Sequence, residues 1–335
     1  MLNIIAHRKI YFIASGLLCL ASILSLAIWG LKPAIDFTGG TLMEIEFKKT
    51  RPSSQEIREA LADLDLENIN IQEIGEKGMI LRMKNIDEKT HQEILKELRI
   101  TNYELGIKET EKLKNEKTKK QENKKIEQIK QLEQTEESIS ESRFESIGPV
   151  IGKELKIKTI WAISLVVIAI LIYIAWAFRK VGKISYTTGV ASWKYGLGAI
   201  IALMHDILIP TGVFAVLGHF AGIEVDLLFI TALLTILGFS VHDTIVVYDR
   251  TRENLGKFPN QNFETTVNQG VNETMTRSIN TSLTVLLTLL IIFFLGSSSI
   301  KNFALALIIG IVLGTYSSIF IASALLVVWQ KMKKR

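Results

Sequence analysis

Long apolar runs dominate the hydrophobic pattern of this chain. A helix needs about 20 residues to cross the hydrocarbon core of a bilayer. The runs that reach this length are Ile10 to Trp29, Ile160 to Phe178, Tyr195 to Leu217, Val225 to Tyr248, Met275 to Leu295 and Phe303 to Trp329. The pattern predicts a polytopic α-helical membrane protein with six transmembrane helices, of which the last five form a bundle within residues 159–335.

The segment from 31 to 158, between the first two runs, has a different pattern. Apolar and polar residues alternate with period two in the predicted strands and recur with helical spacing in the predicted helices. The strands are Thr41 to Phe47, Ile69 to Ile74, Met79 to Met83 and Ser142 to Ile147; the first helix begins at Ser53, and the second runs from Glu88 to Leu98. Their order is that of a ferredoxin-like α+β domain. Asp36 and the pair Gly39 and Gly40 precede the first strand and predict a tight turn.

Within that segment, residues 104–141 are dense in Lys, Glu and Gln and contain almost no aromatic residue. Such a composition does not supply a hydrophobic core. Alternating charges at this density are typical of an exposed helix or of disorder. We therefore expect the charged insert to lie on the surface.

Basic residues lie beside the ends of the apolar runs rather than in one patch. They are His7, Arg8 and Lys9; Arg179, Lys180 and Lys183; Arg250, Arg252 and Lys257; and Lys331, Lys333, Lys334 and Arg335. The positive-inside rule places these ends in the cytoplasm, so both termini are predicted to be cytoplasmic and the α+β domain extracytoplasmic. Topology thus explains the net charge of +5, and no nucleic-acid partner is expected. The single cysteine, Cys19, rules out an intramolecular disulfide, and the sequence predicts no metal site.

An acid lies inside the fourth apolar run, in the stretch FSVHDTIVVYDRTREN. Placing the charged side chain of Asp243 at hydrocarbon depth costs roughly 2.5–3.5 kcal/mol, so it needs a partner, a water-filled cavity or a task. Arg277, near the start of the fifth run, is the natural partner. We expect a buried acid facing a buried cation, a pair that one proton opens. His242 is a neighbouring group of a type that titrates near neutral pH.

Further polar residues interrupt the runs. His205 and Asp206 fall in the middle of the third run, where two interpretations remain open: a hydrogen-bonded pair that holds helices together, or a place on an ion path. Asp249, Arg250 and Arg252, just past the fourth run, predict an interfacial charge cluster that fixes the depth of the helix.

Six motifs in this order resemble those of the SecF family, the six-span membrane subunits that accompany SecD beside the bacterial protein-export channel. The motifs are AIDFTGGTL, SIGPVIGKEL, LMHD, FSVHDTIVVYDRTREN, RSINTSLT and FALALIIGIVLGTYSSIFIAS. The resemblance covers essentially the whole chain. It implies that Asp243 is the membrane acid of the family and Arg277 its arginine in the fifth span, with His242 where the family usually has Asn.

The resemblance also implies a function. The chain would be an accessory subunit of the Sec translocase that uses the proton motive force to promote late steps of protein export. Its partners would be SecD, the SecYEG channel, YajC, the exported unfolded polypeptide and membrane lipid, in the bacterial plasma membrane. No cofactor and no enzyme activity are implied, and the coupling ion is a proton or, alternatively, sodium. The charged insert exceeds the compact family domain, and a second interpretation of it is an arm that reaches the exported chain.

A competing interpretation makes the chain half of an RND-type proton-coupled exporter of small molecules. Such exporters usually carry twelve spans and larger outer domains, so the export subunit is favoured. A membrane hydrolase finds little support, because the sequence contains neither H-E-x-x-H nor G-x-S-x-G.

Overall fold

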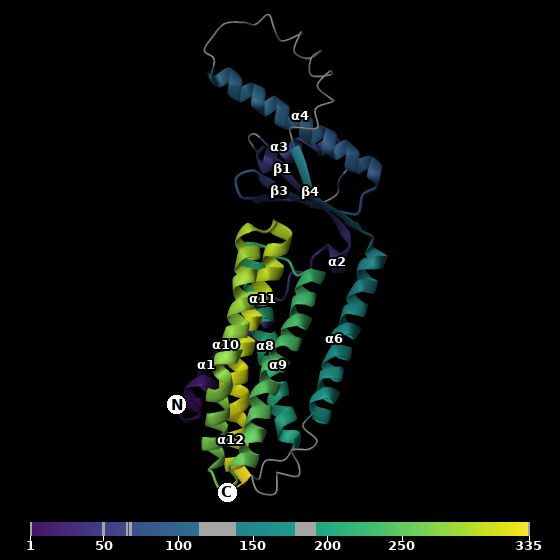
Figure 1. Ribbon diagram of the computed structural model, residues 1–335. Coiled ribbons are helices and arrows are strands. Elements are labelled where there is room, and N and C mark those ends of the chain that lie inside the picture. The colour runs from purple at the N-terminus through teal and green to yellow at the C-terminus, as the bar shows by residue number, and fades with distance from the viewer. Residues whose placement is uncertain are drawn as a thin grey trace, which may run out of the picture. The chain divides into compact units, whose positions relative to one another are not determined.

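The computed structural model describes residues 2–48, 51–64, 66, 69–113, 139–177 and 192–333. They divide into a helical unit, Met1–Pro33 with Ile157–Arg335, and an α+β unit, Ala34–Lys156. Figure 1 shows the elements of both. The charged insert predicted at 104–141 falls largely on 114–138, outside the described residues. Arg179, Lys180, Lys183, Lys334 and Arg335 are outside them too.

The α+β unit contains one antiparallel sheet of four strands in the order β2-β3-β1-β4. Along the chain its elements are α2 (Ile35–Thr38), β1 (Gly40–Phe47), α3 (Ser54–Ala60), η2 (Ala62–Leu64), β2 (Asn70–Ile74), β3 (Gly78–Met83), α4 (Glu88–Leu113) and β4 (Ile139–Ile147). This order and pairing confirm the ferredoxin-like prediction.

Alternation along the central strands builds the core of this unit. Met43 and Ile45 of β1 and Leu81 of β3 are buried against Ile57 of α3 and Ile94 of α4. Burying each such side chain stabilises the fold by roughly 1.5–3 kcal/mol. A capping box between Ser53 and Glu56 starts α3, because each side chain accepts a backbone N–H that the first helical turn leaves free.

Two element ends in this unit differ from the prediction. Helix α4 continues past the expected end at Leu98 to Leu113, because Glu, Lys and Leu favour helix even where no apolar stripe continues. Strand β4 begins at Ile139 rather than Ser142, because the Ile139 side chain packs into the core of the unit.

The helical unit contains six helices long and apolar enough to cross a membrane, so the chain is a multi-pass membrane protein. Its elements are η1 (Ile5–His7), α1 (Arg8–Ile28), α6 (Pro149–Ala177, beginning in the α+β unit), α8 (Ser192–Ala221), α9 (Leu227–Lys257), α10 (Phe263–Leu295), α11 (Ser298–Ser317), the π-helix η5 (Ser318–Ala322) and α12 (Ser323–Lys333). Helix α9 packs against α8, α10 and α11, and α1 packs on α8.

The spanning helices extend beyond the apolar runs that predicted them, most of all α6, α9 and α10. Helix α9 continues past Tyr248 to Lys257, and α10 begins at Phe263, well before Met275. Helix α6 begins at Pro149 instead of Ile160, since proline at the first helical position lacks only an N–H that would have no partner there. Hydropathy marks the apolar part of a helix and misses its polar ends.

Small residues bring α11 close to α9. A side chain at Gly310 would overlap Ile236, and a Cβ at Gly314 would lie 3.0 Å from the Cβ of Ser240. Such close approach is how helices pack in lipid. It brings the polar side chains of the two helices within hydrogen-bonding distance.

Candidate functional site

A fully buried acid, Asp206, joins three helices. Its Oδ1 lies 2.8 Å from Nδ1 of His205, its neighbour on α8. Its Oδ2 accepts hydrogen bonds from Ser240 of α9 at 2.5 Å and from Ser317 at the end of α11 at 2.6 Å. Asp206 has no exposed surface. The pair predicted at 205 and 206 therefore exists, and its acid also bonds two further helices.

His205 has fewer hydrogen-bond partners than Asp206. Its ring stacks on Tyr316 with centroids 6.2 Å apart. Its Nε2 is buried and has no hydrogen-bond partner among the described residues. A buried polar atom without a partner costs about 1–3 kcal/mol, so a hydrogen-bonding partner at this nitrogen would stabilise the site.

The second buried acid, Asp243, lies one helical turn from Ser240 on α9 and is 3% exposed. Its Oδ1 accepts a hydrogen bond from Ser278 of α10 at 3.2 Å. Its Oδ2 is buried without a hydrogen-bond partner among the described residues. Thr315 and Ser282 form a neighbouring hydroxyl pair, 2.5 Å apart, between α11 and α10. An uncompensated carboxylate is costly in such surroundings, and protonation removes that cost.

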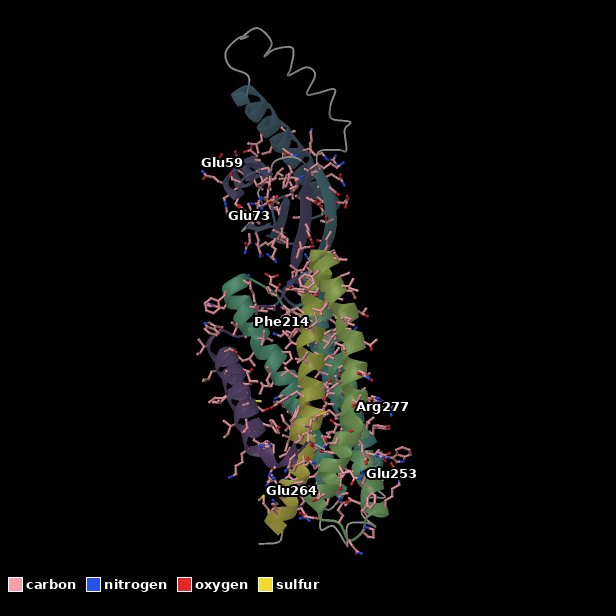
Figure 2. All side chains as sticks on the ribbon, turned by 60° about the vertical axis from the view of Figure 1, so that its left-hand side comes forward. Glu59, Glu73, Phe214, Glu253, Glu264 and Arg277 are labelled. Atoms are coloured by element: carbon pink, nitrogen blue, oxygen red, sulfur yellow. The ribbon has the colours of Figure 1, made fainter. Side chains whose placement is uncertain are left out.

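The predicted burial of the cation is wrong, because Arg277 is exposed on α10. Among the described residues Ser278 donates a hydrogen bond to Asp243, and Arg277 acts on the acid only through space. Figure 2 shows Arg277 pointing away from the bundle. Successive helix positions differ by about 100°, so when Ser278 faces Asp243 its neighbour faces outward. His242 is exposed for the same reason, beside a buried Asp243.

The two acids belong to one polar interface between α9 and the sixth span. Ser240, Asp243 and Thr244 lie on one face of α9, at the spacing of helix neighbours. Thr244 Oγ1 lies 2.8 Å from the hydroxyl of Ser318, which also donates to the Ser240 carbonyl at 3.3 Å. The sequence prediction assigned no function to these hydroxyls. The available signal for these hydroxyls was the recurrence of serine and threonine three or four residues apart within apolar runs.

The sixth span changes its winding at this interface. The π-helix η5 begins at Ser318, directly after the residue that bonds Asp206. Tyr248 of α9 donates its hydroxyl to the carbonyl of Ala322 at 3.0 Å, at the end of η5. Single π-turns inside α-helices are frequent at functional sites, and here bonds from α9 stabilise both ends of one.

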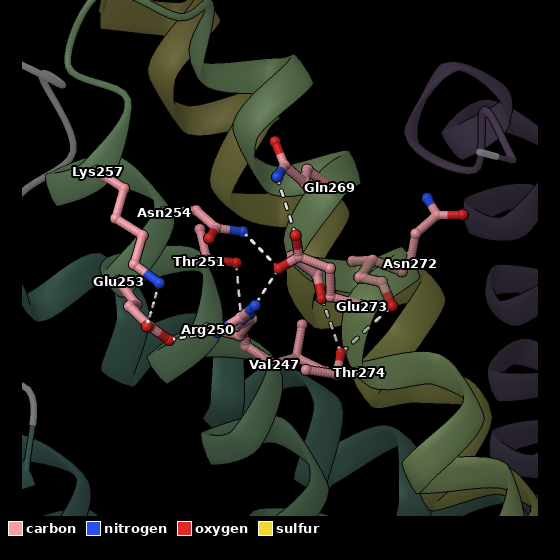
Figure 3. A network of polar contacts seen from close by, with 12 residues as sticks. Val247, Arg250, Thr251, Glu253, Asn254, Lys257, Gln269, Asn272, Glu273 and Thr274 are labelled. Atoms are coloured by element: carbon pink, nitrogen blue, oxygen red, sulfur yellow. Dashed lines mark hydrogen bonds and ion pairs between the residues drawn. The ribbon is translucent and has the colours of Figure 1, made fainter.

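The charge cluster predicted after the fourth run is present and extends to α10 (Figure 3). Asp249 pairs with Arg252 at 2.5 Å, and Arg250 pairs with Glu253 at 2.6 Å. The hub of the cluster is Glu273 of α10, which the sequence prediction missed. Its side chain accepts from Arg250, Asn254 and Gln269 at 2.5, 2.9 and 2.8 Å. The network fastens the polar ends of α9 and α10 together.

A second cluster ties the N-terminal segment to the same end of α10. Glu264 pairs with Arg8 and with Lys331 of α12, each at 2.6 Å. The side chains of Asn268 and Asn272 hydrogen-bond to the backbone of the first residues of the chain. Asn272 donates to the Leu2 carbonyl at 2.9 Å, and Asn268 accepts from the Ile5 N–H. Among the described residues, no group of three His, Cys, Asp or Glu side chains has the arrangement of a metal site.

The predicted turn lies at the start of the sheet. Asp36 is buried in the single-turn helix α2, which Gly39 ends. Gly39 and Gly40 have φ angles of 76° and 130°, a region that favours glycine.

Fold and site together define a class: a polytopic membrane protein with two buried acids, Asp206 and Asp243, inside its bundle and an α+β unit between its first two spans. The model "Protein export membrane protein SecD/SecF, C-terminal" matches residues 127–332, and the "SecD/SecF GG Motif" matches 25–50. The chain belongs to the SecD/SecF family of protein export membrane proteins.

Similar proteins agree with this assignment. A "Protein translocase subunit SecF" from Thermobaculum terrenum is 41% identical over 98% of this chain and 94% of its own length. One from Anaerolinea thermophila is 34% identical over the same shares. The crystal structure of SecDF, a translocon-associated membrane protein from Thermus thermophilus, matches with a TM-score of 0.73 and 28% identity, covering 98% of this chain and 39% of that one.

Proposed function

We propose that this chain is the SecF-type subunit of a protein translocase, which acts with SecD and uses an ion gradient to drive late steps of polypeptide export. Asp243 carries the proposal. It is an acid inside a membrane bundle, one oxygen of which has no hydrogen-bond partner among the described residues. Intramembrane acids of this kind mark ion pathways and proton relays.

Protonation of Asp243 selects which residue of α10 faces it. With a neutral acid, Ser278 faces the carboxyl group and Arg277 faces outward, as in this structure. With an ionised acid, the uncompensated charge attracts the guanidinium, and α10 rotates by about one residue, or 100°, to bring Arg277 inward. Each proton that crosses a membrane potential of 100 mV supplies about 2.3 kcal/mol to bias such a switch.

Asp206 and His205 form a second binding position for the ion in this proposal. The polar interface between α9 and the sixth span joins the two acids through Ser240 on one side and Thr315, Ser317 and Ser318 on the other. A change at Asp243 therefore alters the hydroxyl partners of Asp206 without a change in the backbone fold.

The proposed location is the bacterial plasma membrane. The described basic residues at one set of helix ends, Arg8, Lys9, Arg252, Lys257 and Lys331, support cytoplasmic termini and an extracytoplasmic α+β unit. SecYEG, YajC and the exported polypeptide are the further proposed partners. The names of the relatives favour this function over half of a small-molecule exporter.

Reporter translocation into vesicles that contain the channel, SecD and this chain tests the proposal. The membrane potential, the pH gradient and a sodium gradient are imposed one at a time. We expect the pH gradient and the potential to increase translocation with wild type and with Asp249→Asn, an exposed control, but not with Asp243→Asn. Equal responses from all three chains would contradict the proposal. A response to sodium alone would identify sodium as the coupling ion.

A further inference from the structure

The start of the sheet and the start of α6 touch backbone to backbone. Gly39 ends α2 and donates its N–H to the Ile35 carbonyl at 2.8 Å. A Cβ placed on Gly39 would lie 2.8 Å from the Cα of Pro149, the first residue of α6. Real Cβ atoms do not approach a backbone atom so closely, so a side chain at Gly39 would push α6 away.

The same contact excludes a side chain on the other partner. Gly152, in the first turn of α6, is buried, and a Cβ on it would lie 2.9 Å from the Gly39 nitrogen. A glycine inside a helix costs about 1 kcal/mol relative to alanine. Gly152 has an ordinary helical backbone, so no special conformation requires glycine there. The close packing on Gly39 is therefore the reason that this position needs a residue without a side chain.

The strand ends beside this contact are also fixed. Gly40 pairs with Ile147 of β4, and a Cβ on Gly40 would lie 2.8 Å from the carbonyl of Met83 on β3. The next pair along the strands is held by side chains, with the hydroxyls of Thr41 and Ser146 2.9 Å apart. The sheet therefore presents a rigid edge to α6.

Helix α6 runs without a break from Pro149 to Ala177, and its residues up to Lys156 belong to the α+β unit. Among its described side-chain positions only Gly152 and Ile174 are buried. The helix is thus held tightly at its first turn and is in loose contact with its surroundings over the rest of its length.

We propose that Gly39, Gly40 and Gly152 form a glycine joint that fixes the first turns of α6 rigidly to the sheet, so that tilting of α6 in the membrane moves the α+β unit. Gly39 and Gly40 on one side of the contact and Gly152 on the other are thus positioning residues. What the motion achieves rests on the proposed function; the rigidity does not.

Two matched pairs of variants isolate the close contact. Gly152→Ala introduces the clash, whereas Gly148→Ala adds a methyl group to open space, and neither residue has a positive φ. Gly39→Ala combines backbone strain with the clash. Gly30→Ala has the strain alone, since Gly30 has φ of 66° and no atom near its Cβ position.

The distance between spin labels at Glu46→Cys on β1 and Ile160→Cys on α6 measures the rigidity, in the full chain with SecD and with Cys19→Ser. Both positions are exposed. We expect one narrow distribution in the parent chain, Gly148→Ala and Gly30→Ala, and a broadened or shifted one in Gly152→Ala and Gly39→Ala. Gradient-driven export should be lost in the latter two, with membrane insertion and gradient-independent export retained.

Each outcome decides a separate point. A broad distribution in the parent chain, or an unchanged one in Gly152→Ala, would overturn the joint. A disturbed distribution with full gradient-driven export would overturn its role in transmission. If export by the parent chain ignores the gradient, the proposed function fails, and the distances alone still decide whether the joint exists.

Discussion

The hydroxyl of Ser317 lies 2.6 Å from Oδ2 of Asp206, which joins the end of α11 to an acid in the middle of α8. The bond reaches the residue at which the sixth span changes to π winding. Asp206 is therefore bonded directly to the residue that precedes the π-helix of the sixth span.

Asp206→Ala should destabilise the bundle, because it removes the hydrogen-bond partner of Ser240 and His205 and leaves Ser317 with only the Gly314 carbonyl at 3.1 Å. Buried donors without a partner cost about 1–3 kcal/mol each, and partial rebonding gives an expected loss of roughly 2–4 kcal/mol. Asp206→Asn keeps one acceptor and should lose less. The free energy of unfolding in mixed micelles measures the change. Thr235→Ala, at an exposed hydroxyl on α9, is the control, and an equal loss there would refute the assigned bonds.

Tyr248→Phe and Gly198→Ala should weaken the same bond at the end of η5. The first removes the hydroxyl that donates to the Ala322 carbonyl, and the second places a Cβ 2.5 Å from that hydroxyl. Each should cost roughly 1–2 kcal/mol, and the double variant should cost little more than either alone. Additive losses in the double-mutant cycle would show that the two changes act independently. Gly196→Ala, which meets only ordinary contact at 3.8 Å, is the control.

Glu273→Gln should loosen the polar ends of α9 and α10. The carboxylate accepts from Arg250, Asn254 and Gln269, but its side chain is 26% exposed, so screening limits the loss to about 1 kcal/mol. Amide hydrogen exchange between Arg250 and Glu273 should accelerate, and less so at high salt. Glu253→Gln removes an acid that bonds only within α9 and should leave exchange in α10 unchanged.

The start of α4 should become less stable in acid. The hydroxyl and the backbone N–H of Thr90 donate to the Asp87 carboxylate at 2.6 and 2.9 Å, and they hold the pKa of Asp87 below its ordinary value of 3.8. Folding thus favours the ionised form. This stabilisation is complete above the unfolded pKa and is lost as the pH falls through the folded pKa.

Hydrogen exchange in the first turn of α4 checks this sign. Asp87→Ala should speed exchange at neutral pH, and the difference from wild type should vanish well below pH 3.8. Asp63→Ala, at an exposed acid in η2, should have no effect there. A difference that persists unchanged in acid would mean that the carboxylate does not cap α4.

Much of this fold follows from sequence patterns, because a bilayer requires apolar helices of a minimum length and a sheet requires side chains that alternate between its two faces. Apolar length predicts the six spans, and alternation predicts the strand order around Met43 and Leu81. The close contact of Gly39 with Gly152 was not predictable, since it joins residues distant in the chain that have no side chain to form a pattern.

The site is only partly predictable for a related reason. The cost of charge in lipid singles out Asp243 and Asp206 from sequence alone. Arg277 is exposed rather than buried as predicted, because depth in the membrane does not determine which side of a helix faces the bundle. Hydropathy does not detect the hydroxyl partners of the two acids, since an isolated serine such as Ser240 barely lowers the mean hydropathy of an apolar run.

Infrared difference spectroscopy of the full chain with SecD across a pH titration tests most directly whether Asp243 carries the proton. We expect a C=O stretch from a protonated carboxyl group that disappears as the pH rises, is retained in Asp249→Asn and is absent from Asp243→Asn. A spectrum in which Asp243→Asn retains the same titrating band would contradict the claim that Asp243 carries the proton.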